Sequence, residues 1–198
     1  KKSIENSDII LDHSDFIEYR EVENGEELIV LKGNVEIEYN DKRIFADEVS
    51  INTSSGIITG NGKIVFIDRK KKYFAERFFY STDSDEGLFF NAKSSIKKFI
   101  YTGKLVRKLK KGDKFVVEDA KLSTCNIKYP HYHIQANELS YYDSNYLLIK
   151  NASFCYGQDV LFSLPYYYKN LKEPELKSSL CFRERSGLVV QNTYYPLK

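Results

Sequence analysis

The sequence contains no methionine and no tryptophan, and it has only four prolines and three cysteines among 198 residues. Because it has no initiating methionine, we do not expect it to be a complete translation product. It also has no apolar run of the length that a signal peptide or a membrane-spanning helix requires. We therefore expect a segment of a longer protein from which any export signal has been removed.

The cysteines (Cys125, Cys155 and Cys181) are odd in number, so at least one has no partner inside the segment. Two interpretations remain open at this stage. All three can be buried, unpaired thiols, or at least one can pair with a cysteine outside the segment.

An excess of charge of either sign is also missing. Thirty basic and 28 acidic residues give a net charge of +2, which argues against a nucleic acid as partner. The basic run at residues 107–114 ends in a turn pattern and is interpreted as a solvated hairpin tip, with contact to anionic lipid head groups as the alternative. The lysines at residues 70–72 are interpreted in the same way, as a turn that guards a sheet edge.

What the chain does have is tyrosine and phenylalanine, 16 and 13 residues, which favour strands. It also has an internal repeat. Gly33-Asn34-Val35-Glu36-Ile37 recurs as Gly62-Lys63-Ile64-Val65-Phe66, and Phe45-Ala46-Asp47-Glu48-Val49 recurs as Phe74-Ala75-Glu76-Arg77-Phe78, both with an offset of 29 residues. A fixed period of this size is typical of a stacked β array.

Apolar residues alternate with polar ones between clusters of turn residues, which predicts an all-β architecture of short-looped strands. One apolar face is expected to carry Val35, Ile37, Tyr39, Phe45, Val49, Ile51, Ile58, Ile64, Phe66, Phe74, Phe78, Tyr80 and Phe89. Alternation alone fits two structures equally well. The face can be the core of a closed β-sandwich, or it can line a groove for acyl chains in an incompletely closed sheet.

Candidate chemistry in the sequence is weak. His131 and His133 would share one face of a strand, but no further ligand lies at a metal-site spacing. Ser123-Thr124-Cys125 has no base beside it in the sequence, and adjacent acidic pairs point to opposite faces of a strand. We therefore expect no enzyme activity, no cofactor and no metal. A carbohydrate-active enzyme and a protein-only structural module are the rival interpretations.

Several motifs together resemble one family. Gly33-Asn34-Val35, Ala46-Asp47 and Gly60-Asn61-Gly62 resemble the OstA-like repeat. Ser123-Thr124-Cys125, and the segment from Pro130 to Ala136 with Tyr132 in place of tryptophan, resemble a second pattern of the LPS-assembly proteins called LptD, or organic solvent tolerance proteins. Leu161-Phe162-Ser163-Leu164-Pro165-Tyr166 and Glu184-Arg185-Ser186-Gly187 resemble two further patterns in the same order. In the first of these, Val160 and Ser163 replace a proline and a tyrosine.

The resemblance implies an incompletely closed, V-shaped antiparallel β-jellyroll with an apolar interior groove, at the periplasmic face of the outer membrane. It implies transfer of lipopolysaccharide or another glycolipid from a periplasmic Lpt bridge protein, joined by β-strand addition, to a membrane barrel with a plug lipoprotein of the LptE type. It also implies a disulfide from Cys125 to that barrel. The alternative is a soluble OstA-like bridging scaffold between envelope components.

The expected organisation has three parts. Residues 1–165 form the jellyroll, residues 166–187 form a hinge or linker, and residues 188–198 are the possible start of the barrel. Pro165, at the end of the jellyroll, and Pro174, in the linker, are the expected hinge residues.

Overall fold

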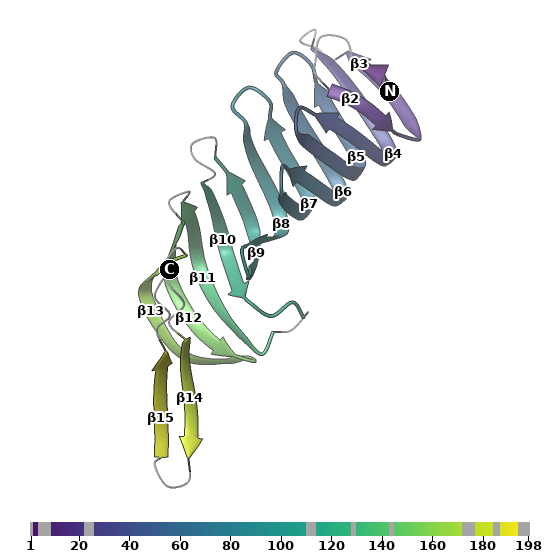
Figure 1. Ribbon diagram of the computed structural model, residues 1–198. Helices are drawn as coiled ribbons and strands as arrows, with labels where there is room; N and C mark the ends of the chain where they lie inside the picture. Colours follow the sequence, from purple (N-terminus) through teal and green to yellow (C-terminus); the bar gives the residue numbers. More distant parts are fainter. Residues whose placement is uncertain are drawn as a thin grey trace.

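The computed structural model describes residues 2–3, 9–21, 26–109, 114–127, 130–142, 145–171, 177–183 and 187–193, of which 2–3, 177–183 and 187–193 are described by backbone alone. These residues form antiparallel strands and turns (Figure 1). The strands are β1 (Lys2–Ser3), β2 (Ile9–His13), β3 (Phe16–Glu21), β4 (Glu27–Tyr39), β5 (Lys42–Asn52), β6 (Ile57–Asp68), β7 (Lys71–Ser81), β8 (Glu86–Ile96), β9 (Phe99–Lys108), β10 (Phe115–Ser123), β11 (Tyr132–Tyr142), β12 (Tyr146–Tyr156), β13 (Asp159–Asn170), β14 (Lys177–Arg183) and β15 (Gly187–Thr193).

The first thirteen strands make one sheet in which β4 to β13 follow one another in chain order. Two short strands share the start of the sheet, since β2 pairs with the second half of β4 and β3 with its first half. The sheet does not close on itself, because β13 pairs only with β12 among the described strands. The prediction of an all-β, incompletely closed antiparallel sheet is confirmed.

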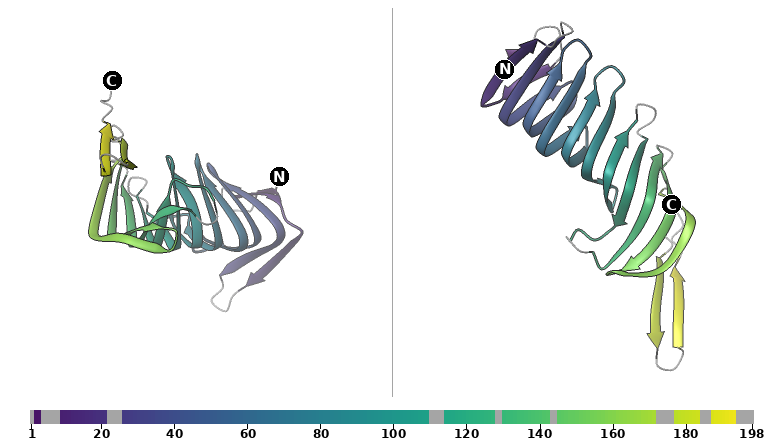
Figure 2. Two further views of the ribbon diagram at one scale, coloured as in Figure 1. Left: turned by 90° about the horizontal axis from the view of Figure 1, so that it is seen from below. Right: turned by 180° about the vertical axis from the view of Figure 1, so that it is seen from behind.

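Each long strand bends near its middle, and the bends align into a corner that runs through the sheet (Figure 2). In β4 the bend is made by Gly33 and Asn34, with φ of 77° and 46°, and in β6 by Gly62 and Lys63, with φ of 72° and 41°. Asn91, Asp119 and Asn151 take the same left-handed conformation in β8, β10 and β12. Glycine and asparagine tolerate this region best, so the glycine that recurs in the repeat, at Gly33 and Gly62, specifies the corner in β4 and β6.

Small residues fill the inside of the corner, where the two halves of the sheet converge. A Cβ atom at Gly103 would collide with Val117, and one at Gly60 would collide with the ring of Phe78. The buried inner residues of this row are Ala46, Gly60, Ala75, Ala92, Gly103, Ala120, Ala136 and Ala152.

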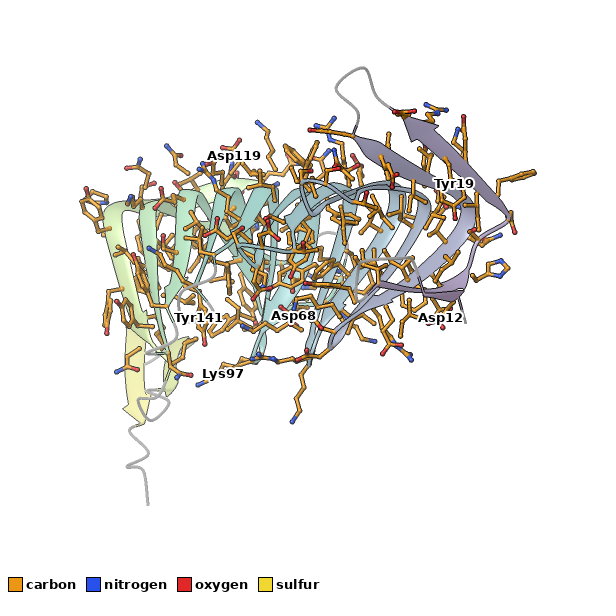
Figure 3. The ribbon with its side chains drawn as sticks, turned by 90° about the horizontal axis from the view of Figure 1, so that it is seen from above. Asp12, Tyr19, Asp68, Lys97, Asp119 and Tyr141 are labelled. Atoms are coloured by element: carbon orange, nitrogen blue, oxygen red, sulfur yellow. The ribbon has the colours of Figure 1, made fainter. Side chains whose placement is uncertain are left out.

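The corner divides the sheet into two arms. Arm A carries the two-residue turns at 40–41, 69–70 and 97–98, and arm B carries the longer turns at 53–56 and 82–85. Figure 3 looks onto the folded sheet, with Asp119 on the outer side of the corner and Asp68, Lys97 and Tyr141 towards the mouth between the arms.

The prediction that Phe45 and Phe74 share the inner face is wrong. Phe74 is 47% exposed and Phe45 is half-buried on the outer face, whereas their neighbours Ile44 and Tyr73 are buried inside. Two successive residues face outward at the corner, Glu76 and Arg77 in β7, so the alternation changes phase there. Counting by twos through the corner therefore assigns the first half of such a strand to the wrong face.

The predicted boundary at residue 165 falls inside β13. Tyr166 and Tyr167 pair with Lys150 and Ile149 of β12, so the first residues of the expected linker are strand. Pro165 lies in β13 at the corner, opposite Asn151, where an edge strand can do without a backbone donor. Pro174 lies outside the described residues. Of residues 188–198, those up to Thr193 belong to β15, which pairs with β14 in a separate two-stranded sheet.

Candidate functional site: the interior between the arms

The inner face predicted from the repeat lies between the two arms. Phe66 is 0% exposed and Tyr39 packs against the core while partly exposed. The predicted residues that the structure buries between the arms are Val35, Ile37, Val49, Ile51, Ile58, Ile64, Phe66, Phe78, Tyr80 and Phe89.

Aromatic rings from the two arms touch in this part of the interior. Tyr73 of arm A stacks on Phe89 of arm B, with ring centroids 4.8 Å apart and planes 8° apart. The Phe66 and Phe89 rings meet edge to face at 5.1 Å. Tyr101 of arm A stacks on Phe115 of arm B at 5.0 Å. From β4 to β10 the interior is therefore a packed core in which the arms are in contact.

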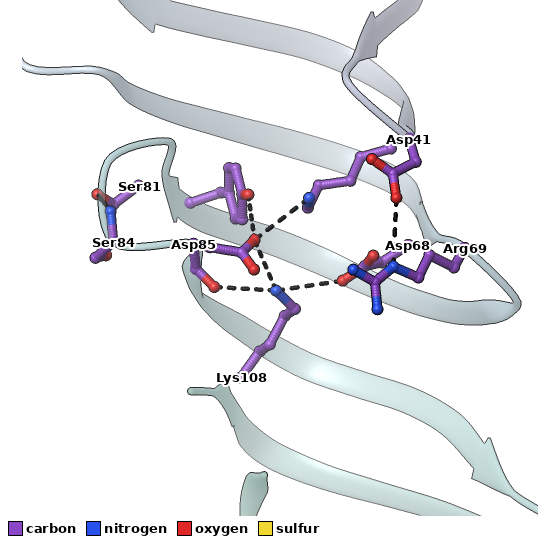
Figure 4. Close-up of polar contacts among 9 residues, drawn as sticks. Asp41, Asp68, Arg69, Ser81, Ser84, Asp85 and Lys108 are labelled. Carbon is purple, nitrogen blue, oxygen red and sulfur yellow. Dashed lines mark hydrogen bonds and ion pairs between the residues drawn. The ribbon is translucent and has the colours of Figure 1, made fainter. Parts of the chain in front are cut away.

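Charged side chains close the mouth above this core (Figure 4). The Lys108 Nζ of arm B lies 3.2 Å from an Asp68 carboxylate oxygen of arm A. The Lys42 Nζ of arm A lies 3.3 Å from Asp85 Oδ1 of arm B. Within arm B, Lys108 also donates to Asp85 at 2.9 Å and the Tyr80 hydroxyl donates to Asp85 at 2.6 Å. We call Lys42, Asp68, Tyr80, Asp85 and Lys108 the mouth cluster.

The mouth cluster is unevenly buried, since the Asp68 side chain is 12% exposed and that of Asp85 is 42% exposed. Lys42 and Lys108 are 8% and 7% exposed. Burial opposes ionisation of Asp85, but hydrogen bonds from Lys108 and Tyr80 and the charges of Lys108 and Lys42 outweigh it and lower the pKa of Asp85 to about 2. Burial, followed by the hydrogen bond to Asp85, raises the pKa of Tyr80 above its ordinary value. Asp85 is thus held as the anion and Tyr80 as the neutral phenol.

The interpretation of residues 107–114 as a solvated tip is wrong for Lys108, which lies in this cluster. The lysines at 70–72 are likewise not simply a solvated turn, since the Lys71 Nζ lies 5.7 Å from the centre of the Tyr141 ring on arm B. Sequence reasoning missed these residues because each lies beside a turn, where charge is ordinary.

The interior opens towards β13. A cavity of about 260 Å³ lies on arm A between β9 and β13, and its walls are almost entirely carbon. The apolar side chains that line it include Leu122, Ile134, Phe154, Cys155, Leu161 and Phe162. Leu161 and Phe162 on the last strand are 66% and 52% exposed. This open part lies outside the clear 29-residue repeat, so periodicity did not indicate it.

Polar atoms at the rim of this cavity are held in fixed positions. The Ser123 hydroxyl donates to the Tyr132 carbonyl at 2.7 Å, and the Thr124 hydroxyl lies 2.5 Å from the Tyr132 hydroxyl. The Cys125 amide donates to Ser123 Oγ at 3.1 Å, which places this half-buried, free cysteine beside the cavity. His133 also lines the cavity, and burial lowers its pKa.

A larger cavity of about 710 Å³ lies on the outer face near the corner. Its lining includes Lys93, Lys121 and the ion pair between Lys104 and Asp119, whose Nζ and Oδ2 are 2.8 Å apart. Among the described residues no group of three histidine, cysteine or acidic side chains is placed to hold a metal. The described part of the chain also has no helix that is long and apolar enough to cross a membrane.

Comparison with known proteins finds similarity to solved structures and none to a family model or a curated protein. A solved structure that is similar to part of it is LptH of Pseudomonas aeruginosa, described as the LptA-homologous periplasmic component of the conserved lipopolysaccharide transport device. The identity is 13%, the match covers 82% of this chain and 94% of LptH, and the TM-score is 0.29. A likeness of this size carries no argument about function.

Proposed function

We propose that this chain is a lipid-carrying β module of lipopolysaccharide transport, and not an enzyme. It receives the acyl chains of lipopolysaccharide or a related glycolipid on its apolar inner face. The cavity between β9 and β13 is where the chains lie first, because that part of the inner face is open. Burying an acyl chain there is favourable by about 0.8 kcal/mol for each CH₂ group.

The observation that carries this proposal is that residues from the family-like motifs line one cavity. Ser123-Thr124 and Tyr132-His133-Ile134 belong to one of the family-like patterns and Leu161-Phe162 to another, and all of them line the same apolar cavity. A purely structural role for these motifs would not require them to converge on one open, carbon-walled site.

The edge strand β13 supports a partner that binds by strand addition. Its outer edge is unpaired among the described residues, and Tyr166 and Tyr168 are 66% and 57% exposed. A strand from a periplasmic Lpt bridge protein added to one edge of the sheet would extend the apolar inner face from one protein into the next.

The finer proposal places the chain at the periplasmic face of the outer membrane. A barrel begins within residues 188–198, and a plug lipoprotein of the LptE type occupies it. Cys125 forms a disulfide with the barrel. The half-buried, unpaired state of Cys125 beside the cavity supports this assignment.

The second candidate is a bridging scaffold that contacts protein only. The packed core from β4 to β10 favours it, because that part of the interior is filled by the chain's own aromatic rings.

Photocrosslinking in cells from position 134 separates the two candidates, with position 135 as the matched control. Ile134 lines the cavity, and its neighbour Gln135 is exposed on the outer face of the same strand. The transport function predicts lipid adducts at 134 and not at 135. Protein adducts alone, or lipid equally at both positions, would favour the scaffold.

A further inference from the structure

The polar contacts between the arms follow one pattern. Besides the mouth cluster, the Lys97 ammonium of arm A donates to the Leu171 carbonyl just after β13, at 2.5 Å. With Lys42, Lys71 and Lys108, this makes four lysines that each reach from one arm to the other. They lie along the mouth, at the opposite side of the sheet from the corner.

The contacts of the mouth cluster are not a by-product of strand pairing. β6 pairs with β5 and β7, and β9 pairs with β8 and β10, so Asp68 and Lys108 are brought together only because the arms fold over each other. Separating the arms would break the Lys108–Asp68 and Lys42–Asp85 pairs while leaving every backbone ladder intact.

We propose that the mouth cluster is an ionic latch that keeps the interior from β5 to β9 shut, so that apolar chains reach this section only when the latch opens. The inference rests on the proposed function and divides the interior into two sections that acyl chains enter in order. The section near β13 is open at all times, and the latched section is entered second.

The chemistry of the cluster suits a contact that can open and close better than a permanent one. Both lysines and both aspartates would regain water when the arms part, so the opened state leaves no charge buried and unpaired. In the closed state Lys108 and Asp68, whose side chains are 8% and 12% exposed, are shielded from solvent and salt more than a surface pair is, which favours the shut state.

The test uses the purified chain and a palmitic acid that carries a diazirine, with labelled residues mapped by mass spectrometry. The latch variant is Lys108→Met with Asp68→Asn, which removes one cation and one anion together and leaves Lys42 paired with Asp85. The matched control is Lys104→Met with Asp119→Asn, a pair of the same chemistry on the outer side of the corner. A second latch variant, Lys42→Met with Asp85→Asn, covers a failure of the first to fold.

We expect both latch variants to raise labelling of inner residues in β5 to β9 about tenfold, the effect of losing one charged hydrogen-bonded contact. Labelling around Ile134 should be unchanged, and the control should behave like the unaltered chain. Equal, weak labelling of β5 to β9 in all proteins, with Ile134 labelled throughout, would overturn the latch and leave the proposed function standing.

Absence of labelling everywhere would instead refute the proposed function. In that case, amide hydrogen exchange in β6 to β8 tests whether the mouth cluster holds the arms together. Faster exchange in the latch variants than in the control supports a latch, and equal exchange overturns it.

Discussion

Two phenylalanine-to-alanine substitutions test the folded sheet most directly, because the sequence pattern predicts the same inner face for both positions. Phe66→Ala removes a fully buried ring whose centroid lies 5.1 Å from that of Phe89 and 5.3 Å from that of Tyr80. Truncating such a ring destabilises by about 3–5 kcal/mol. Phe74→Ala removes a ring that is 47% exposed on the outer face. Since full burial of a phenylalanine is worth about 1.5–3 kcal/mol, we expect it to cost about 1 kcal/mol.

Urea unfolding followed by far-ultraviolet circular dichroism measures the difference. With a slope of about 2–3 kcal/mol per molar urea, Phe66→Ala should lower the midpoint by roughly 1.5 M and Phe74→Ala by less than about 0.5 M. Unchanged slopes in both variants would show that the comparison is of stability alone. Equal shifts of the two midpoints would refute the phase change at the corner, and with it the assignment of Phe74 to the outer face.

Three further outcomes are expected. Gly103→Ala should lower the unfolding midpoint, by about 1–3 kcal/mol of stability, because the new methyl group meets Val117 at the corner; an unchanged midpoint would contradict this packing. The lowered pKa of Asp85, about 2 against 3.8, contributes stability that is present above pH 4 and lost as the pH falls towards 2. Asp85→Asn should therefore flatten the pH dependence of the urea midpoint in that range. Parallel curves for the variant and the unaltered chain would count against the mouth cluster. Iodoacetamide should modify the half-buried Cys125 before Cys155, which is 5% exposed, as judged by mapped peptides; the reverse order would contradict the packing around the cavity.

Sequence reasoning went furthest where a local rule decides the structure. Period-two alternation and turn residues predicted an antiparallel, all-β sheet, and the 29-residue offset between Gly33 and Gly62 predicted a repeating unit. Both predictions succeed because they depend on backbone geometry that residues close together in the sequence determine.

The assignment of faces failed where the rule of alternation is interrupted. Phe45 and Phe74 lie before the corner, and the outward pairs that follow them, such as Glu76 and Arg77, reverse the parity. The small residue just before each outward pair, Ala46 or Ala75, marks the corner and could have indicated the change.

The mouth cluster could not be predicted, because it depends on how the arms meet. Asp68 and Lys108 are 40 residues apart and belong to strands that never pair. Each taken alone looks like an ordinary charge beside a turn, and only the folded sheet brings them to 3.2 Å.

The consecutive strand order has a consequence for how such a protein can change in length. Because β4 to β13 each pair with their neighbours in the chain, a two-strand unit could be duplicated or lost without any strand having to cross another. The inner corridor would lengthen or shorten by the width of two strands, while the corner would continue unchanged. Contacts between strands that are not neighbours, such as those from Lys108 to Asp68 and from Lys71 to Tyr141, would have to find new partners. The number of strands in the array can thus change freely, whereas the lysine contacts across the mouth depend on which strands are present.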